Sequence, residues 1–176
     1  MKKSNYNIVF AGGGTGGHLY PALAVADELK RTTGSVSIRF VGAERGLETR
    51  LVPEAGYPLK TLPLHGMKGA GLLGKLKAAF AAALAVLSCV ASMAGSRPDL
   101  VIGVGGYASG PAVLAARLLM IRTMILEQNH FPGATNRWLA GWVNRICVPS
   151  QSARSRFGNR GEITGNPVRA AVTRIG

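Results

Sequence analysis

Short apolar runs alternate with segments of helical periodicity in the first part of the chain. The run at residues 8–11 is apolar and ends at a glycine cluster, as expected for a buried parallel strand. Apolar residues recur at helical spacing over residues 22–29. Residues 36–40 alternate between apolar and polar, which is typical of a strand with one less buried face. These segments predict a first strand-helix-strand unit.

A similar order of segments follows. The sequence predicts a helix over residues 46–55 and a short extended piece over residues 61–64. The segment HGMKGAGLLGK, residues 65–75, predicts a mobile, basic loop that opens a long alanine-rich helix. Residues 100–104 form a second apolar run that ends in glycines, so they predict a second buried strand.

The last third of the chain continues the alternation. It predicts a helix over residues 111–119, then strands at residues 124–126 and 146–148 that flank a helix containing Trp138 and Leu139. Strands that alternate with helices predict one α/β domain with a Rossmann-like, doubly wound parallel sheet flanked by helices.

One apolar segment approaches the length of a membrane span. Residues 78–96 carry no charge, and about 20 apolar residues are needed to cross a bilayer. Alanine dominates the segment, and Ser88, Ser92 and Gly95 interrupt it. Because alanine contributes little transfer free energy, we expect a long core-packed or interfacial helix rather than a span.

Composition and charge narrow the class of partner. The 176 residues are 47% apolar and carry a formal net charge of +13, with no acidic residue between Glu54 and Asp99. This predicts a folded domain with a negatively charged partner, which net charge alone does not identify. Sparse aromatic residues argue against nucleic acid. Cys89 and Cys147 suit two reduced core thiols, and the N-terminus lacks a signal-peptide pattern, so we expect the cytosol.

Two glycine turns carry the candidate chemistry. The stretch AGGGTGGHLYP, residues 11–21, places five glycines in six positions between a strand and a helix. Free backbone N–H groups at the positive end of a helix attract phosphate. The stretch GVGGYASGP, residues 103–111, has the same setting, and both turns would emerge at the carboxyl edge of the sheet. The alternative that glycine only allows tight packing stays open at this point.

The first turn also satisfies a dinucleotide-binding pattern. Gly12, Gly14 and Gly17 match G-x-G-x-x-G, so a dinucleotide-binding oxidoreductase domain is a remote alternative. The second strand does not end in the acidic residue that would hold a ribose, and Glu44 is only nearby.

Several polar residues stand beside these turns. His18 would lie at a helix N-terminus, where the helix dipole favours the neutral imidazole, so it is either a catalytic base or a packing residue. Tyr107, Ser109, Glu127 and Asn129 offer hydrogen bonds suited to sugars. Ser109 could instead cap a helix, and Asn129 could shape a turn. Metal-binding and serine-hydrolase motifs are absent from the sequence, so we expect no metal and no cofactor.

The segments GGGTGGHLYPALAVADEL, GVGGYASGP, LEQN and GNPVR, in this order, resemble the N-terminal half of the MurG family over essentially the whole chain. The resemblance implies an inverting GT-B glycosyltransferase that moves N-acetylglucosamine from UDP-N-acetylglucosamine to lipid-linked N-acetylmuramyl-pentapeptide (lipid I to lipid II) in peptidoglycan synthesis. Residues 1–164 would form the acceptor and membrane-facing domain. Residues 165–176 would begin the linker to a donor-binding domain that is absent from this chain.

The resemblance also implies roles for individual residues. His18 would be the base or would orient the acceptor hydroxyl. The donor would contact Thr15, Gly16, Gly17, Asn129 and Arg169. The acceptor and its diphosphate would contact Gly14, Gly105, Gly106, Tyr107, Ser109 and Glu127.

Since the family's acceptor carries a polyprenyl chain, the resemblance implies a peripheral protein on the cytoplasmic face of the bacterial inner membrane. Phe80 could join the membrane surface or cover the sheet. The chain alone is expected to be inactive without its C-terminal half or a complementary chain. The alternative is a non-catalytic membrane-docking subunit that recruits a separate donor-binding chain. The residues expected to face the membrane are Lys68, Leu72, Leu73, Lys75, Leu76 and Lys77.

Overall fold

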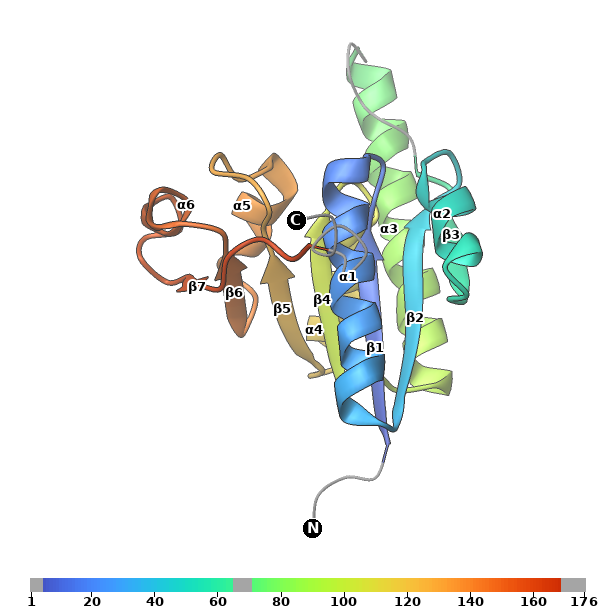
Figure 1. The fold of residues 1–176 in the computed structure, drawn as a ribbon. Helices are drawn as coiled ribbons and strands as arrows, with labels where there is room; N and C mark the ends of the chain where they lie inside the picture. The colour runs from blue at the N-terminus through green and yellow to red at the C-terminus, as the bar shows by residue number, and fades with distance from the viewer. Residues whose placement is uncertain (1–4, 65–70, 169–176) are drawn as a thin grey trace.

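Seven parallel strands form the central layer of the domain (Figure 1). The computed structural model describes residues 5–64 and 71–168. The strand order is β3-β2-β1-β4-β5-β6-β7, and each neighbouring pair is parallel. The predicted Rossmann-like parallel sheet is therefore confirmed. The strands are β1 (Tyr6–Gly12), β2 (Val36–Ala43), β3 (Leu59–Leu62), β4 (Leu100–Gly105), β5 (Arg122–Leu126), β6 (Arg145–Val148) and β7 (Glu162–Ile163).

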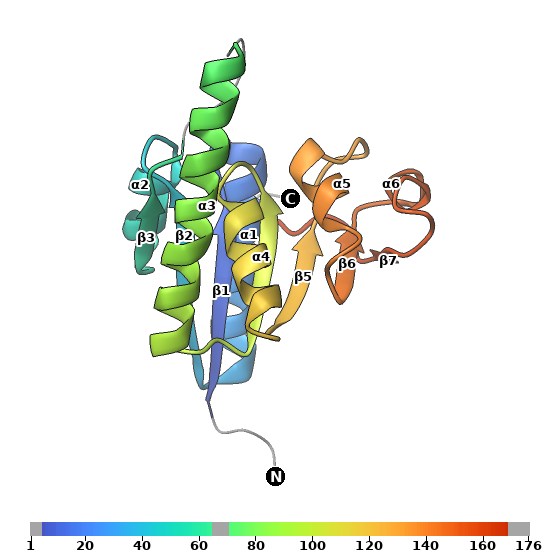
Figure 2. The same ribbon diagram turned by 180° about the vertical axis from the view of Figure 1, so that it is seen from behind.

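Helices cover both faces of this sheet. Figure 1 shows α1 in front of the sheet, and Figure 2, which shows the opposite side, has α3 and α4 in front. α2 packs into the same core cluster as α1, whereas α5 and α6 join the cluster under α3 and α4. The helices are α1 (Gly16–Thr33), α2 (Glu48–Glu54), α3 (Leu72–Gly95), α4 (Ser109–Leu118), α5 (Ala134–Leu139) and α6 (Gln151–Ser155).

The two faces of β1 belong to two separate cores. Val9 and Ala11 lie in the cluster under α3 and α4, whereas Ile8 and Phe10 lie in the cluster under α1. Alternate side chains of a strand point to opposite faces, and both faces of β1 are covered. This is why the strand reads as one continuous apolar run in the sequence. In the α1 cluster the ring of Phe10 stacks on Phe40, with centroids 5.2 Å apart.

α3 packs on one side only. Ala85, Cys89 and Met93 are buried in the core cluster that includes α4, and burial raises the pKa of the Cys89 thiol to about 11. The opposite side of the helix is exposed, and Phe80 is 67% exposed, so this side chain does not cover the sheet. Figures 1 and 2 show the first turns of α3 projecting beyond the rest of the domain. The large exposed apolar residues of α3 are Leu73, Leu76, Phe80, Leu84 and Leu87, called here the α3 apolar stripe.

The segment Leu76–Gly95 has the length and composition of a membrane span, with a mean hydropathy of 2.0. It is the one helix in the described part of the chain that meets this test, and 17% of its most apolar window is buried. A spanning position would have to withdraw Ala85, Cys89 and Met93 from the core, at the cost of their burial. The packing thus favours a helix that lies against the domain.

The predicted order of elements agrees with the structure, but two boundaries differ and two short elements were not predicted. β3 begins at Leu59, two residues before the predicted extended piece. α3 begins at Leu72, so the end of the predicted loop is helical. α6 and β7 were not predicted, because elements of five and two residues are too short to show a periodicity. Residues 65–70, where a mobile loop was predicted, lie outside the described residues.

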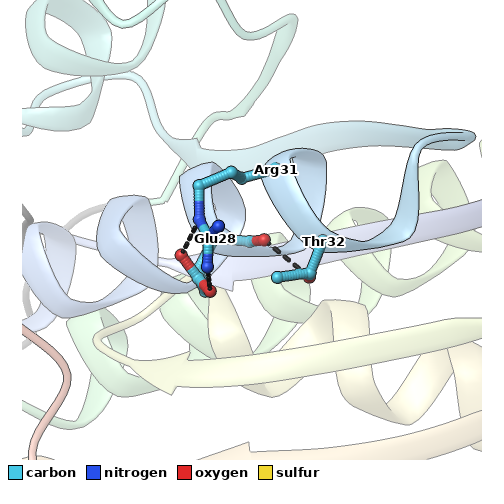
Figure 3. Close-up of polar contacts among 3 residues, drawn as sticks. All are labelled: Glu28, Arg31 and Thr32. Atoms are coloured by element: carbon cyan, nitrogen blue, oxygen red, sulfur yellow. Dashed lines mark hydrogen bonds and ion pairs between the residues drawn. The ribbon is translucent and has the colours of Figure 1, made fainter.

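The end of α1 remote from the glycine turn is held by local contacts (Figure 3). Arg31 donates from Nε to Oε2 of Glu28 at 2.8 Å, and the Thr32 hydroxyl donates to the Glu28 carbonyl at 2.8 Å. The hydrogen bond from Arg31 lowers the pKa of Glu28. Since these side chains are exposed, the pair contributes little to stability. The buried face of α1, which includes Leu19 and Leu23, fixes the helix and hence the start of α1 at the sheet's carboxyl edge.

Candidate functional site

The two glycine turns pack against each other at the carboxyl ends of β1 and β4. These strands are neighbours in the sheet, and the Gly13 N–H donates to the Gly105 carbonyl at 3.1 Å. A β-carbon on Gly106 would lie 2.4 Å from the Gly13 carbonyl oxygen, closer than real contacts allow. Tight packing, the alternative left open by the sequence, therefore explains glycine at position 106. It does not explain Gly14, because a β-carbon there would meet nothing within 4 Å.

Replacing Gly106 by alanine should separate the two turns. Gly106 has φ +80°, a conformation that alanine disfavours by about 1–2 kcal/mol, and its β-carbon would meet backbone rather than a movable side chain. We expect a loss of about 3 kcal/mol in the free energy of unfolding. Urea unfolding measures it, with Gly34→Ala as the control, because Gly34 has φ +69° but open space around it. Equal losses in the two variants would show that the turns do not depend on this contact.

A pocket of about 540 Å³ opens between the two turns and the start of α5. The structure thus brings together residues that are about 90 positions apart in the sequence, from the first and the second turn. Six residues expected at the site line it: Gly14, Thr15, His18, Gly105, Gly106 and Tyr107.

His18 lies in the first turn of α1, between the two glycine turns. Its backbone N–H donates to the Thr15 carbonyl at 3.2 Å, and its Nδ1 lies 3.0 Å from the Thr15 hydroxyl. On its other side, the Nε2 would be 3.0 Å from a β-carbon on Gly105. The ring is therefore confined at the pocket wall, and a neutral imidazole in this place can accept a proton from a bound hydroxyl.

Two backbone N–H groups of the first glycine turn already donate hydrogen bonds within the protein. The Gly14 N–H donates to Oε2 of Glu48 at 2.7 Å, and the Gly13 N–H is bonded to Gly105. These two amides are therefore not free to bind phosphate, which corrects the expectation that the turn offers them. The amides of Gly16 and Gly17 lie in the first turn of α1, where a helix supplies no partner of its own. Neither residue is among those lining the pocket.

Glu127 organises the loop after β5. Glu127 was expected to contact the acceptor. In the structure it is fully buried and lies outside the pocket lining. Asn129, the other polar residue expected here, is exposed and also lies outside the pocket lining. The Glu127 carboxylate accepts hydrogen bonds from the backbone N–H groups of Gln128, Asn129 and Gly133 and from the side-chain amides of Asn129 and Asn136.

The remaining predicted site residues are placed as follows. Ser109 is fully buried, lies outside the pocket lining, and has a hydroxyl without a hydrogen-bond partner among the described residues. The residue before α4 is Ala108, so the alternative that Ser109 caps this helix was wrong. Arg169 and Lys68 lie outside the described residues, as do the side chains of Leu72 and Lys75. Leu73, Leu76 and Lys77 are exposed on α3.

Four polar residues of the pocket were not singled out from the sequence: Arg45, Glu48, Thr135 and Asn136. Arg45 and Glu48 follow β2, and the rule that ligands bind at the carboxyl ends of parallel strands could have indicated them. Asn136 is in α5 and is 1% exposed, and no local pattern marks it. Within residues 5–64 and 71–168, no group of three or more histidine, cysteine, aspartate or glutamate side chains could hold a metal ion.

Comparison with known proteins gives a family match over most of the domain. Residues 8–148 match the model of the glycosyltransferase family 28 N-terminal domain. A protein of Myxococcus xanthus named UDP-N-acetylglucosamine–N-acetylmuramyl-(pentapeptide) pyrophosphoryl-undecaprenol N-acetylglucosamine transferase is 46% identical over 163 residues, which are 92% of this chain and 43% of that protein. The chain spans about half the length of the curated relatives it matches, for example 48% of the relative from Magnetococcus marinus.

Comparison with solved structures also finds a MurG protein. The crystal structure of MurG from Acinetobacter baumannii aligns with a TM-score of 0.74 and 32% identity, over 93% of this chain and 45% of that one. UDP-N-acetylglucosamine 2-epimerase from Neisseria meningitidis, solved with UDP-N-acetylglucosamine bound, aligns with a TM-score of 0.63. It covers 92% of this chain and 46% of that one, and at 13% identity the likeness shows the fold alone. The resemblance to the MurG family seen in the sequence is thus confirmed.

Proposed function

The chain belongs to glycosyltransferase family 28 as an N-terminal domain, and from this premise we propose that it is the acceptor-binding half of a UDP-N-acetylglucosamine-dependent hexosyltransferase. The reaction transfers N-acetylglucosamine from UDP-N-acetylglucosamine to polyprenyl-diphosphate-linked N-acetylmuramyl-pentapeptide during peptidoglycan synthesis. The names of the curated relatives, at 42–46% identity, support this assignment.

One observation carries the proposal: both glycine turns, His18 and Tyr107 line a single pocket. An acceptor sugar in this pocket would place a hydroxyl near the confined imidazole. His18 would accept the proton of that hydroxyl as its oxygen attacks the anomeric carbon of the donor. UDP would leave from the opposite side, so the configuration at the anomeric carbon would invert.

Positive groups in and beside the pocket suit a diphosphate-bearing substrate. Arg45 lines the pocket, and the amides of Gly16 and Gly17, which lie outside the pocket lining, are at the positive end of α1. Such groups offset the negative charge of a diphosphate. Contacts of the donor with Thr15, Asn129 and Arg169 remain predictions.

Donor binding requires more than this domain. The curated relatives are about twice as long as the chain, and we infer that their second half, or a complementary chain, supplies most of the donor site. The domain would extend to residue 164 and a linker would follow. We therefore expect the chain alone to bind the acceptor and to have little or no transferase turnover.

Complementation tests this function. Labelled UDP-N-acetylglucosamine and a short-chain lipid-linked muramyl-pentapeptide are incubated with the chain alone, with a matching C-terminal half alone, and with both. Turnover only in the mixture of both halves would support the proposal. No turnover in the mixture, with both halves folded and an active full-length relative as the control, would contradict it.

The α3 apolar stripe provides a surface for an anionic membrane. Its residues recur at spacings of three and four, which places them on one side of the helix, and each is at least 47% exposed. Lys77 is exposed on the same helix, and the chain has no acidic residue from position 55 to position 98. Apolar side chains beside basic ones bind the interface of anionic bilayers. This supports a peripheral position on the cytoplasmic face of the inner membrane, where the lipid-linked acceptor would be met.

Polar substitutions in the stripe should weaken membrane binding without unfolding the domain. For the double variant Leu76→Ser and Phe80→Ser we expect binding to vesicles of anionic phospholipid to fall by about tenfold or more. The thermal midpoint should stay the same, because both side chains are exposed. Vesicle sedimentation measures the effect, with Leu47→Ser as the control, because Leu47 directly precedes α2 and its side chain is 41% exposed. Unchanged sedimentation of the double variant would exclude this surface.

A further inference from the structure

A buried carboxylate lies beneath the first glycine turn. Glu48 is the first residue of α2, and only 1% of its surface is exposed. Its Oε2 accepts a hydrogen bond from the Gly14 N–H at 2.7 Å, and its Oε1 accepts one from the Ala43 N–H at 2.8 Å. These are the hydrogen bonds that the carboxylate makes within the described residues. Glu48 thereby joins the turn after β1 to the end of β2.

Three glycines make room for this side chain. A β-carbon on Gly13 would lie 2.6 Å from the carboxylate carbon of Glu48, one on Gly42 would lie 2.4 Å from its Cγ, and one on Gly46 would lie 2.2 Å from Oε2. Real β-carbons essentially never come within 3.0 Å of another heavy atom. Glycine at these positions is therefore explained by a side chain of the protein itself, without any ligand.

The turn needs such a contact to keep one shape. Gly13 and Gly14 have φ of +140° and +85°, and glycine loses more conformational entropy than any other residue when its backbone is fixed. On the side where a β-carbon would point, Gly14 faces open space. The hydrogen bond to Glu48 thus holds the backbone of Gly14, beside the bond from the Gly13 N–H to Gly105.

The position of Gly14 affects the position of His18 through Thr15. Thr15 follows Gly14 directly, its carbonyl accepts the His18 N–H at 3.2 Å, and its hydroxyl lies 3.0 Å from Nδ1 of the ring. A shift of Gly14 would move Thr15, and Thr15 sets both the backbone and the Nδ1 side of His18. The path from carboxylate to imidazole therefore consists of one hydrogen bond, one peptide link and two contacts.

We propose that Glu48 is a positioning residue of the pocket, which holds the first glycine turn through Gly14 and, through Thr15, sets the place of the His18 ring. The role of the ring in transfer rests on the proposed function. The path from Glu48 to the ring does not, so the two can be tested separately.

Nuclear magnetic resonance of the chain tests this positioning in the wild type, in Glu48→Gln and in Glu44→Gln. Glutamine retains one acceptor oxygen but presents an N–H₂ group where the second backbone N–H arrives. We expect the Gly14 amide to exchange with solvent about tenfold faster or more in Glu48→Gln, and the Nδ1 and Nε2 signals of His18 to shift. Glu44 is exposed and lies outside the pocket lining, so Glu44→Gln should match the wild type.

A second variant covers the case in which Glu48→Gln does not fold. Gly46→Ala keeps the carboxylate but places a methyl group against Oε2, and the same changes at Gly14 and His18 are expected. A folded variant of either kind with wild-type exchange at Gly14, or with unshifted His18 ring signals, would overturn the proposal. A merely structural role would lower the unfolding midpoint but leave these ring signals unchanged.

Binding of a short-chain lipid-linked muramyl-pentapeptide separates this inference from the proposed function. We expect about tenfold weaker binding by Glu48→Gln than by the wild type. If the wild type binds and the variant binds equally well, the positioning role is wrong. If the wild type does not bind, the proposed function fails, whereas the resonance results still decide whether Glu48 positions His18.

Discussion

Replacing His18 by alanine is expected to lower transferase turnover by about 100- to 10,000-fold in the complemented enzyme, the range typical of a lost general base. His18 lines the pocket, its ring is confined between Thr15 and Gly105, and alanine leaves no group there to accept the proton of the acceptor hydroxyl. Steady-state rates over a series of acceptor concentrations measure the effect. The loss should appear in kcat and not only in KM, because the proton moves during the chemical step.

His130 provides the matched control for this experiment. It is exposed, lies outside the pocket lining, and its Nδ1 is 2.8 Å from the Ser150 hydroxyl. We expect His130→Ala to retain the wild-type rate. A loss of less than about threefold for His18→Ala, with wild-type unfolding behaviour, would show that His18 is not the base. Another group, outside this pocket or in the complementary half, would then have to take the proton.

Replacing Glu127 by alanine is expected to give the largest loss of stability, about 4 kcal/mol in the free energy of unfolding. The carboxylate is fully buried and accepts hydrogen bonds from five N–H groups. Alanine would leave these donors without their partner, and each of those that is buried would cost about 1–3 kcal/mol. Urea unfolding at 25 °C measures the loss. Glu127→Gln should cost less, because one acceptor oxygen remains.

An exposed glutamate provides a control that loses the same negative charge without the loss of a buried side chain. Glu54 lies 3.8 Å from Arg50 and its side chain is 60% exposed, so Glu54→Ala removes the same charge without creating buried donors. Its unfolding curve should match that of the wild type. If Glu127→Ala is no less stable than Glu54→Ala, the loop after β5 does not depend on the carboxylate. The same result would remove the support that Glu127 gives to Asn136 at the pocket.

Local patterns determined much of the fold and part of the site. The strands β1 and β4 are buried on both faces, so their sequences are apolar runs. Each run ends in glycines, which predict a turn. His18 was found because it follows the first turn at the start of a helix, and its contact with Thr15 spans only three residues. Tyr107 was found in the same way beside the second turn. Each of these features depends on neighbours in the chain.

Only the tertiary structure showed which side of α3 is exposed. The apolar spacing of this helix is the same whether Phe80 packs on the sheet or faces outward. The side of α3 that faces the domain is set by the core cluster under α4, in which Ala85, Cys89 and Met93 are buried. Since that side of the helix is filled, Phe80 and its neighbours in the α3 apolar stripe lie outside.

The site itself was decided by contacts between distant segments. The sequence by itself determined that two glycine turns follow two buried strands, that His18 stands beside the first, and that strands and helices alternate. It did not determine that Gly106 must fit against Gly13, or that the Gly14 N–H is taken by Glu48, 34 residues away. The physical reason is that these contacts arise from the pairing of β1 with β4 and β2, which brings the turns and the carboxylate to one edge of the sheet. Periodicity and turn chemistry act over a few residues, whereas close approach across strands depends on the whole sheet.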